Sequence, residues 1–173
     1  MHPLFHPLFV DYCAYFNGNE DYFECHEVLE EYWKDVAPGD KEHALVGFVQ
    51  VATGLYHWRR GNGIGAARIL KKARYNLLQN KQSPFVEFVA LEQLLIYIDN
   101  VLLQIDLDNP FKAFSFPLTN IELETLVTER MKSLASENLD FLVNKHMLRD
   151  RSSILREREE NKKKKLANKS RHN

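Results

Sequence analysis

The chain has 173 residues, of which 45% are hydrophobic and 12% aromatic, with a formal net charge of −1. This composition is typical of a globular protein and argues against an intrinsically disordered chain. No apolar run approaches the ~20 residues of a membrane-spanning helix, and no basic or small-residue signal-peptide pattern opens the chain. The two cysteines, Cys13 and Cys25, lack disulfide or metal spacing. We therefore expect a cytoplasmic protein without a membrane partner.

The small net charge combines an acidic body with a basic C-terminal segment. From Arg149 onward there are ten Lys and Arg against four Asp and Glu, whereas the preceding residues hold thirteen against twenty. The segment has too few apolar residues to offset the entropy of ordering. We predict a helical domain over residues 1–148 and a basic, solvated or disordered tail over 149–173. Solubility is the favoured role of Lys162–Lys165, with nucleic-acid or anionic-lipid contact the weaker alternative.

Two helices are predicted in the N-terminal region. A short apolar helix over about residues 9–16 ends at Asn17-Gly18, a common C-terminal stop. Asn19 then caps a helix over Tyr22–Trp33, whose first turn carries acids that the helix dipole favours. The two helices are therefore joined by a short turn.

The second helix places a histidine and an acid on its apolar side. At about 100° per residue, His26 and Glu30 lie one turn apart within an arc of apolar side chains. The other charged residues of this helix fall on the solvent side: Glu24, Glu27, Glu31 and Lys34. A buried carboxylate costs several kcal/mol unless it is paired or binds a cation. The sequence thus predicts a partner for Glu30.

A third helix, over about Glu42–Arg60, is apolar almost all round and should lie in the middle of a bundle. Its exceptions form one polar stripe: His43, Gln50, Thr53 and His57. Gly54 costs helix stability by about 1 kcal/mol but allows a neighbour to approach closely. We expect the polar stripe to face the edge of the second helix that carries His26 and Glu30.

The remaining helices follow from turn and cap signals. Gly61-Asn62 connects the third helix to one over Gly63–Gln79, and Ser83-Pro84 opens a long helix that reaches Ile105. The loop over Asp106–Pro117 has three phenylalanines that we expect to pack onto the body, Phe111, Phe114 and Phe116. A capping-box pattern at Thr119–Glu122 opens a last helix. The prediction is an all-α, compact bundle of five to six helices with a charged C-terminal extension.

His26 and Glu30 have the i, i+4 spacing at which two side chains can share a metal ion. His57 is the candidate third ligand, with Gln50 as a supporting or ligand-binding group and Trp33 donating its indole N–H to Glu30. Two histidines and a carboxylate suit zinc, iron or manganese. The zinc-protease and ferritin-like spacings are both absent. The alternative is a buried His–Glu–Gln network that only fixes helix packing.

Two further charged features have structural alternatives. Glu27 is the candidate general base beside the site, or else a solvated surface acid. The glycine-rich segment Arg59–Gly65 precedes a basic helix, but its spacing is neither that of a Rossmann nor of a Walker loop. We interpret it as a tight turn followed by a solvated basic face and assign no anion-binding residues; the alternative is a phosphate site at the start of the basic helix.

Two blocks of the sequence resemble the bacterial and archaeal DUF309 family. The first, over Phe16–Trp33, contains His-x3-Glu-x2-Trp, and the second covers Gly47–Ala66. The resemblance spans about residues 7–78, which would be the family-like core. It implies a small all-helical domain and a metal-binding role for the His/Glu motif, with Trp33 as part of it and Gln50 and His57 in the second block.

These observations support two hypotheses of different classes. The first is a metal-dependent hydrolase, in which the metal would lower the pKa of a bound water and an unknown small molecule would be the substrate. The second is a non-enzymatic helical scaffold or interaction module. Neither the substrate nor the oligomeric state follows from the residues.

Overall fold

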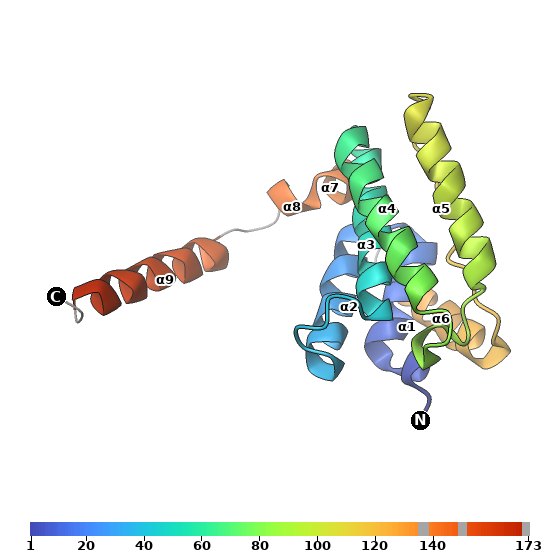
Figure 1. Ribbon diagram of the computed structural model, residues 1–173, viewed down its shortest axis with the longest axis horizontal. Coiled ribbons are helices and arrows are strands. Elements are labelled where there is room, and N and C mark those ends of the chain that lie inside the picture. The colour runs from blue at the N-terminus through green and yellow to red at the C-terminus, as the bar shows by residue number, and fades with distance from the viewer. Residues whose placement is uncertain (135–138, 149–151, 171–173) are drawn as a thin grey trace. The chain divides into compact units, whose positions relative to one another are not determined.

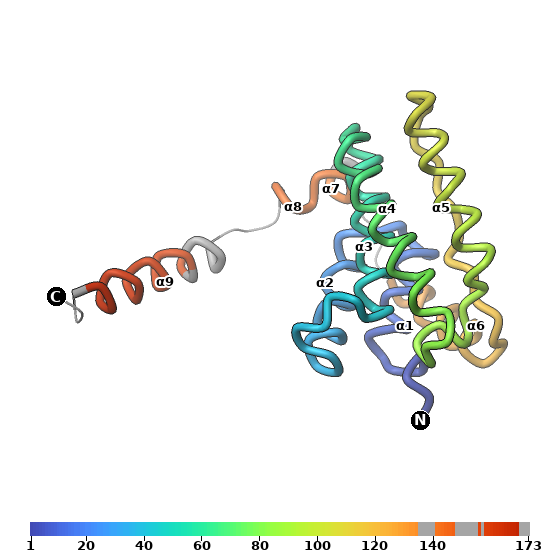
Figure 2. The backbone as a smooth tube through the Cα atoms, in the orientation of Figure 1, coloured from blue at the N-terminus to red at the C-terminus, as the bar shows by residue number. Residues whose placement is uncertain are grey.

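The computed structural model describes residues 1–134, 139–148 and 152–170, and the chain divides into two compact units, Met1–Val143 and Asn144–Asn173. Figures 1 and 2 show the path of the chain. The first unit contains η1 (Pro3–Phe5), α1 (Pro7–Ala14), η2 (Tyr15–Asn19), α2 (Tyr22–Val36), α3 (Ala44–Arg59), α4 (Gly63–Gln79), η3 (Pro84–Val86), α5 (Leu91–Asp106), α6 (Ile121–Lys132) and α7 (Leu139–Val143). The second contains α8 (Lys145–Leu148) and α9 (Ser152–Ser170).

The predicted all-α class is confirmed. The described residues form nine α-helices and no strand beyond an isolated bridge between Val89 and Leu118. The expected count of five to six was too low, because the region after α6 divides into short helices and the charged extension contains α9. The side chains described in α9 are exposed. None of the described helices has the length and apolar content needed to cross a membrane.

Helix α3 occupies the central position expected from its all-round hydrophobicity. It packs most extensively against α4 and also against α2 (Figure 1). Two glycines of α3 permit the close contact with α4. A Cβ on Gly54 would lie 2.5 Å from Leu70 Cδ2, and a Cβ on Gly47 would lie 2.8 Å from Leu77 Cδ2. A close approach at Gly54 was predicted for a neighbouring backbone; the structure shows it instead for the Leu70 side chain.

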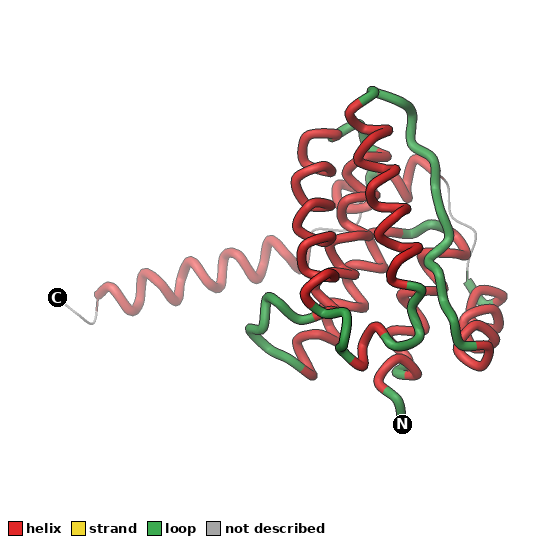
Figure 3. Tube along the Cα trace, turned by 45° about the vertical axis from the view of Figure 1, so that its right-hand side comes forward, coloured by secondary structure: helices red, strands yellow, loops and turns green. Residues whose placement is uncertain are grey.

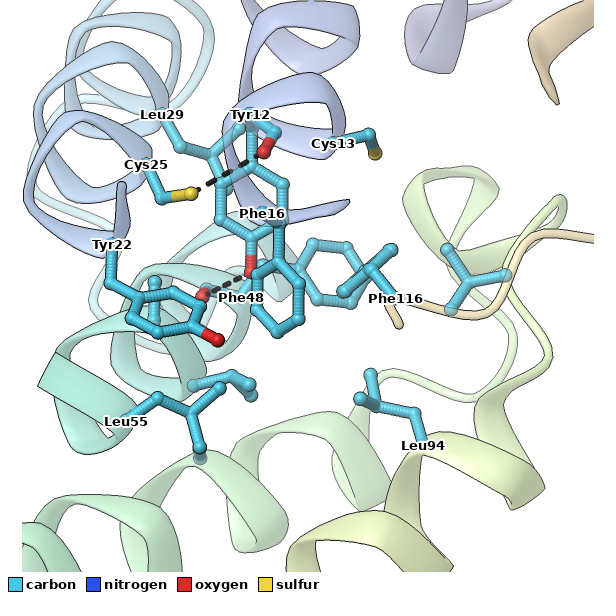
Figure 4. Close-up of a cluster of buried hydrophobic side chains, with 14 of the residues drawn as sticks. Tyr12, Cys13, Phe16, Tyr22, Cys25, Leu29, Phe48, Leu55, Leu94 and Phe116 are labelled. Carbon is cyan, nitrogen blue, oxygen red and sulfur yellow. Dashed lines mark hydrogen bonds between the residues drawn. The ribbon is translucent and has the colours of Figure 1, made fainter. Parts of the chain in front are cut away.

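The core is an aromatic cluster built from segments far apart in the sequence (Figure 4). Phe116, from the loop after α5, has its ring centroid 5.3 Å from that of Tyr12 and 5.4 Å from those of Phe16 and Phe48. The buried Tyr12 hydroxyl donates to the main-chain oxygen of Phe48 at 2.8 Å. The loop therefore completes the core rather than merely connecting two helices.

The loop between α5 and α6 runs back along α5 (Figure 3). Phe114 stacks on Tyr97 of α5 with centroids 4.8 Å apart, and Phe111 lies 5.1 Å from the Trp58 ring. The three phenylalanines thus pack onto the body as predicted.

The predicted start of the fifth helix at Pro84 was wrong. Residues Pro84–Val86 form only a single 3-10 turn, and α5 begins at Leu91. The intervening backbone pairs with the loop instead: Ala90 N–H donates to Pro117 O at 3.0 Å, and Thr119 N–H donates to Phe88 O at 2.9 Å. Two long-range hydrogen bonds therefore replace those that a continuous helix would make.

Several helices are capped by residues other than those expected. Asp21, not Asn19, caps α2 by accepting from Glu24 N–H at 3.1 Å. In the capping-box segment, Asn120 accepts from Leu123 N–H at 2.9 Å and starts α6. His43 caps α3, with its Nδ1 accepting from Leu45 N–H at 3.2 Å. His2 and His6 do the same for η1 and α1.

Candidate functional site

Histidine, carboxylate and lysine side chains of α2 contact one another in a row along the helix. His26 Nε2 lies 3.2 Å from Glu30 Oε2, and the other carboxylate oxygen of Glu30 lies 2.6 Å from Lys34 Nζ. His26 Nδ1 lies 3.4 Å from Glu27 Oε1. The imidazole is therefore flanked by carboxylates at both ring nitrogens, and Glu30 is flanked by two cationic or potentially cationic groups.

The site is at the edge of the bundle rather than within it. The side chains of His26 and Glu30 are 36% and 31% exposed, so they are half-buried. The predicted need for a partner of Glu30 is met by Lys34, whose pKa is raised by the hydrogen bond to that carboxylate. Sequence reasoning had placed Lys34 on the solvent side. Its i, i+4 spacing from Glu30 was the signal that could have identified the pair.

The structure does not bring His57 into a metal-ligating group with His26 and Glu30. Among the described residues, no three His, Cys, Asp or Glu side chains are arranged to hold a metal ion. His57 Nδ1 instead lies 3.4 Å from the amide nitrogen of Asn62, at the turn that follows α3. Burial, with a smaller contribution from Arg60, lowers the pKa of His57.

The prediction that the Trp33 indole N–H donates to Glu30 was wrong. This N–H donates to the main-chain oxygen of Asp40 at 2.8 Å. The reason is the path of the segment between α2 and α3, which folds back beside the end of α2 through a turn at Gly39, whose φ is 81°. Trp33 therefore anchors this segment.

Gln50 Oε1 is not hydrogen-bonded to the His/Glu pair. This oxygen is buried and has no hydrogen-bond partner in the part of the chain that the structure describes. The buried His–Glu–Gln network of the alternative hypothesis is therefore not formed through this oxygen. The structure places Gln50 at a groove instead.

This groove, which we call the α3–α4 groove, has a volume of about 470 Å³. It is lined by residues of the α2–α3 segment, α3 and α4: Lys41, Glu42, Gln50, Lys71, Lys72, Tyr75, Asn76 and Gln79. Sequence reasoning missed it, apart from Gln50, because the α2–α3 segment and the end of α4 come together only in three dimensions.

The glycine-rich segment between α3 and α4 is a tight turn. Gly61 has a φ of 84°, which glycine adopts without strain. Asn62 Oδ1 accepts from Gly65 N–H at 3.0 Å and caps α4. The cap occupies a first-turn donor that an anion would otherwise use.

Comparison with known proteins identifies the family of this chain. A domain of unknown function, DUF309, matches residues 9–69. The chain is also 37% identical over 166 residues to the uncharacterized protein YpuF of Bacillus subtilis (strain 168), covering 90% of this chain and 94% of YpuF. The chain belongs to the DUF309 family. The resemblance noted from the two sequence blocks is therefore confirmed.

The DUF309 match includes the whole of α2 and α3 but only the first part of α4, up to residue 69. All the α4 residues that line the α3–α4 groove lie beyond it. No solved structure matches the chain significantly.

Proposed function

We propose that this DUF309 protein is a non-enzymatic, helical ligand-binding module and that the α3–α4 groove is its ligand site. The observation that carries the proposal is the unpaired, buried Oε1 of Gln50, which borders the groove. Leaving a buried acceptor without a donor costs about 1–3 kcal/mol. This oxygen has almost no accessible surface, so the Gln50 side chain must turn toward the groove before a ligand can reach it. A ligand that then donates a hydrogen bond to it would recover that energy.

The dimensions and lining of the groove support binding rather than acid–base catalysis. Its volume of about 470 Å³ falls within the 300–1,000 Å³ that is usual for small-molecule sites. The lining contains one carboxylate, Glu42, and no histidine, cysteine, serine or threonine. Histidine, the most frequent general acid–base residue, and the hydroxyl and thiol nucleophiles are therefore missing from the lining. The amides and lysines that are present can orient a ligand through hydrogen bonds and charge.

The test is an NMR and thermal-shift screen of the full chain against amino acids, sugar phosphates, nucleosides and nucleotides. We expect at least one class to shift the amide resonances of Gln50, Lys72 and Asn76 and to raise the melting temperature. Gln50→Leu should abolish both effects, whereas Gln82→Leu, an exposed glutamine outside the groove, should retain them. If no compound shifts these resonances, the groove is not a small-molecule site.

A second candidate function is supported by the His26–Glu30 distance. Two ligand atoms that each lie about 2.1 Å from one tetrahedral zinc ion are about 3.4 Å apart, close to the observed 3.2 Å between Nε2 and Oε2. We propose that a divalent zinc, iron or manganese ion could be held by this pair, with His57 as a further ligand only after rearrangement. A bound metal would acidify its water for hydrolysis, and Glu27 would be the adjacent base.

Lys34 supplies a direct test of this candidate, because its ammonium group competes for Glu30. Titration of untagged protein with Zn²⁺ or Mn²⁺ should show binding that His26→Ala and Glu30→Gln abolish and that Lys34→Met strengthens. Glu31→Gln, on an exposed residue of the same helix, is the matched control. Equal affinity in all variants would exclude the His26–Glu30 pair as a metal site.

A further inference from the structure

We infer that the α3–α4 groove binds a nucleoside phosphate, either free or as part of a single-stranded nucleic acid. This inference rests on the proposed function, because it names the ligand class of the same groove. Three properties of the lining support it: uncompensated positive charge, an exposed aromatic ring, and an amide oxygen without a donor. Each property matches one part of a nucleotide.

The positive charge in the groove is not neutralised by its surroundings. Lys41, Lys71 and Lys72 line the groove, and none forms an ion pair with another described residue. The lining has a single acid, Glu42. Because lysine ammonium groups bind phosphate oxygens well, this excess of cations favours a phosphorylated ligand.

The composition of α4 also favours a phosphorylated ligand. The helix Gly63–Gln79 contains four cationic residues and neither aspartate nor glutamate. Only Arg74 is paired within the described chain, through Asp99 of α5 at 2.7 Å. The body before the basic tail is acidic as a whole, so a helix with unneutralised lysines differs from the rest of its surface.

The ring of Tyr75 lies beside these lysines. It is 66% exposed, and its position three and four residues after Lys72 and Lys71 puts it on the same side of α4. No other aromatic ring contacts it within the described residues. An exposed ring next to cations is the arrangement that single-stranded nucleic-acid sites use, with the base stacked on the ring and the phosphate beside the lysines.

The amides provide a means of recognising the base. Asn76 is already engaged: its Nδ2 donates to Lys41 O at 3.3 Å, and its Oδ1 accepts from Asn80 Nδ2 at 3.1 Å. Gln50 Oε1 remains without a donor. A glutamine side chain can accept from N6 and donate to N7 of adenine. With its side chain turned toward the groove, Gln50 would therefore match adenine best among the bases.

Exposed lysines alone are common on protein surfaces, so the variants must separate simple charge attraction from nucleotide recognition. The experiment is isothermal titration of the full chain with ATP, adenosine, tripolyphosphate and the oligonucleotide (rA)10, without added divalent metal. Far-UV circular dichroism and melting temperature of each variant verify that it is folded.

We expect ATP to bind, with affinity lowered at least about 10-fold by the double substitution Lys71→Ser and Lys72→Ser, and about 10-fold by Tyr75→Ala or Gln50→Leu. Arg68→Ser is the matched control, because Arg68 is an exposed cation of α4 outside the groove lining. It should change the affinity less than about threefold. Tighter binding of (rA)10 than of ATP would identify a strand as the source of the nucleotide, and the reverse would identify a free nucleotide.

Three results would overturn the inference. Binding of ATP and tripolyphosphate with equal affinity, insensitive to Tyr75→Ala and Gln50→Leu, would show attraction to lysines alone. Failure of both ATP and (rA)10 to bind, while another class of compound shifts the groove resonances, would exclude nucleotides but leave the proposed ligand site intact. If no compound of any class shifts those resonances, both proposals fail.

Discussion

Gly54 of α3 lies directly against Leu70 of α4, so that a Cβ at Gly54 would be 2.5 Å from both Cγ and Cδ2 of the leucine. Both residues are fully or almost fully buried. We predict that Gly54→Ala destabilises the protein by about 1–2 kcal/mol, because overpacking exceeds the gain of about 1 kcal/mol in helix propensity. Urea unfolding followed by circular dichroism would measure the change.

A double-mutant cycle tests whether Leu70 is the cause. Leu70→Ala alone should cost about 2–5 kcal/mol. In the Gly54→Ala background it should cost less, because the truncated side chain makes room for the new methyl group. Additive effects of the two substitutions would contradict the proposed clash.

The hydrogen bond between the Tyr12 hydroxyl and Phe48 O links α1 to α3 within the core. Burial raises the pKa of Tyr12 well above its ordinary value, so the hydroxyl stays a neutral donor. We expect Tyr12→Phe to lower the free energy of unfolding by about 0.5–1.5 kcal/mol. Tyr75→Phe, at an exposed ring, should change it by less than about 0.5 kcal/mol. Equal effects would exclude a specific contribution from the Tyr12 hydroxyl.

Stability should fall in mild acid because of His43. Burial lowers the pKa of His43 below its ordinary value of 6.5, with Asp40 opposing the shift, and its Nδ1 must remain unprotonated to accept from Leu45 N–H. Below pH 6.5 the unfolded chain therefore binds more protons than the folded one, and stability decreases until the folded-state pKa is passed. His57, whose pKa is also lowered, acts in the same direction.

The measurement is the urea midpoint at pH 7.5 and pH 5.5. The midpoint should be lower at pH 5.5, and His43→Asn, which keeps a neutral capping group, should reduce the difference. An unchanged difference in this variant would show that other groups cause the acid sensitivity.

The two thiols should be unreactive in the folded protein. Cys13 and Cys25 are completely buried, and burial raises the pKa of both thiols well above the ordinary value. A thiol reagent such as DTNB at pH 8 should therefore label neither residue until the chain unfolds, and both in guanidinium chloride. Rapid labelling of either thiol under native conditions would contradict the packing in Figure 4.

Features that depend on nearby residues were predictable from the sequence. Helix α4 has the predicted bounds, Gly63–Gln79, because Asn62 caps its first turn and Gly61 ends the helix before it. The central position of α3 followed from its apolar composition. The start of α5 was not predictable, since the competing partner of Phe88 and Ala90 is a loop almost thirty residues later.

In the candidate site, too, contacts within one helix were predictable and contacts with residues outside that helix were not. The i, i+4 contact between His26 and Glu30 was predicted correctly from helical spacing. The partners of Trp33 and His57 were not, because Asp40 and Asn62 reach them through turns outside those helices.

The sequence by itself determined the helical class, the family, the central helix and the His26–Glu30 pair, because periodicity, caps and helical spacing act over a few residues. Only the tertiary structure decided that His57 turns to Asn62, that Gln50 borders a groove and that Lys41 joins the lysines of α4 there. These relationships depend on how α3 and α4 are rotated against each other and on the return path of the α2–α3 segment. Both are outcomes of packing the whole core, with its glycine contacts and its inserted Phe116, and not of any local pattern.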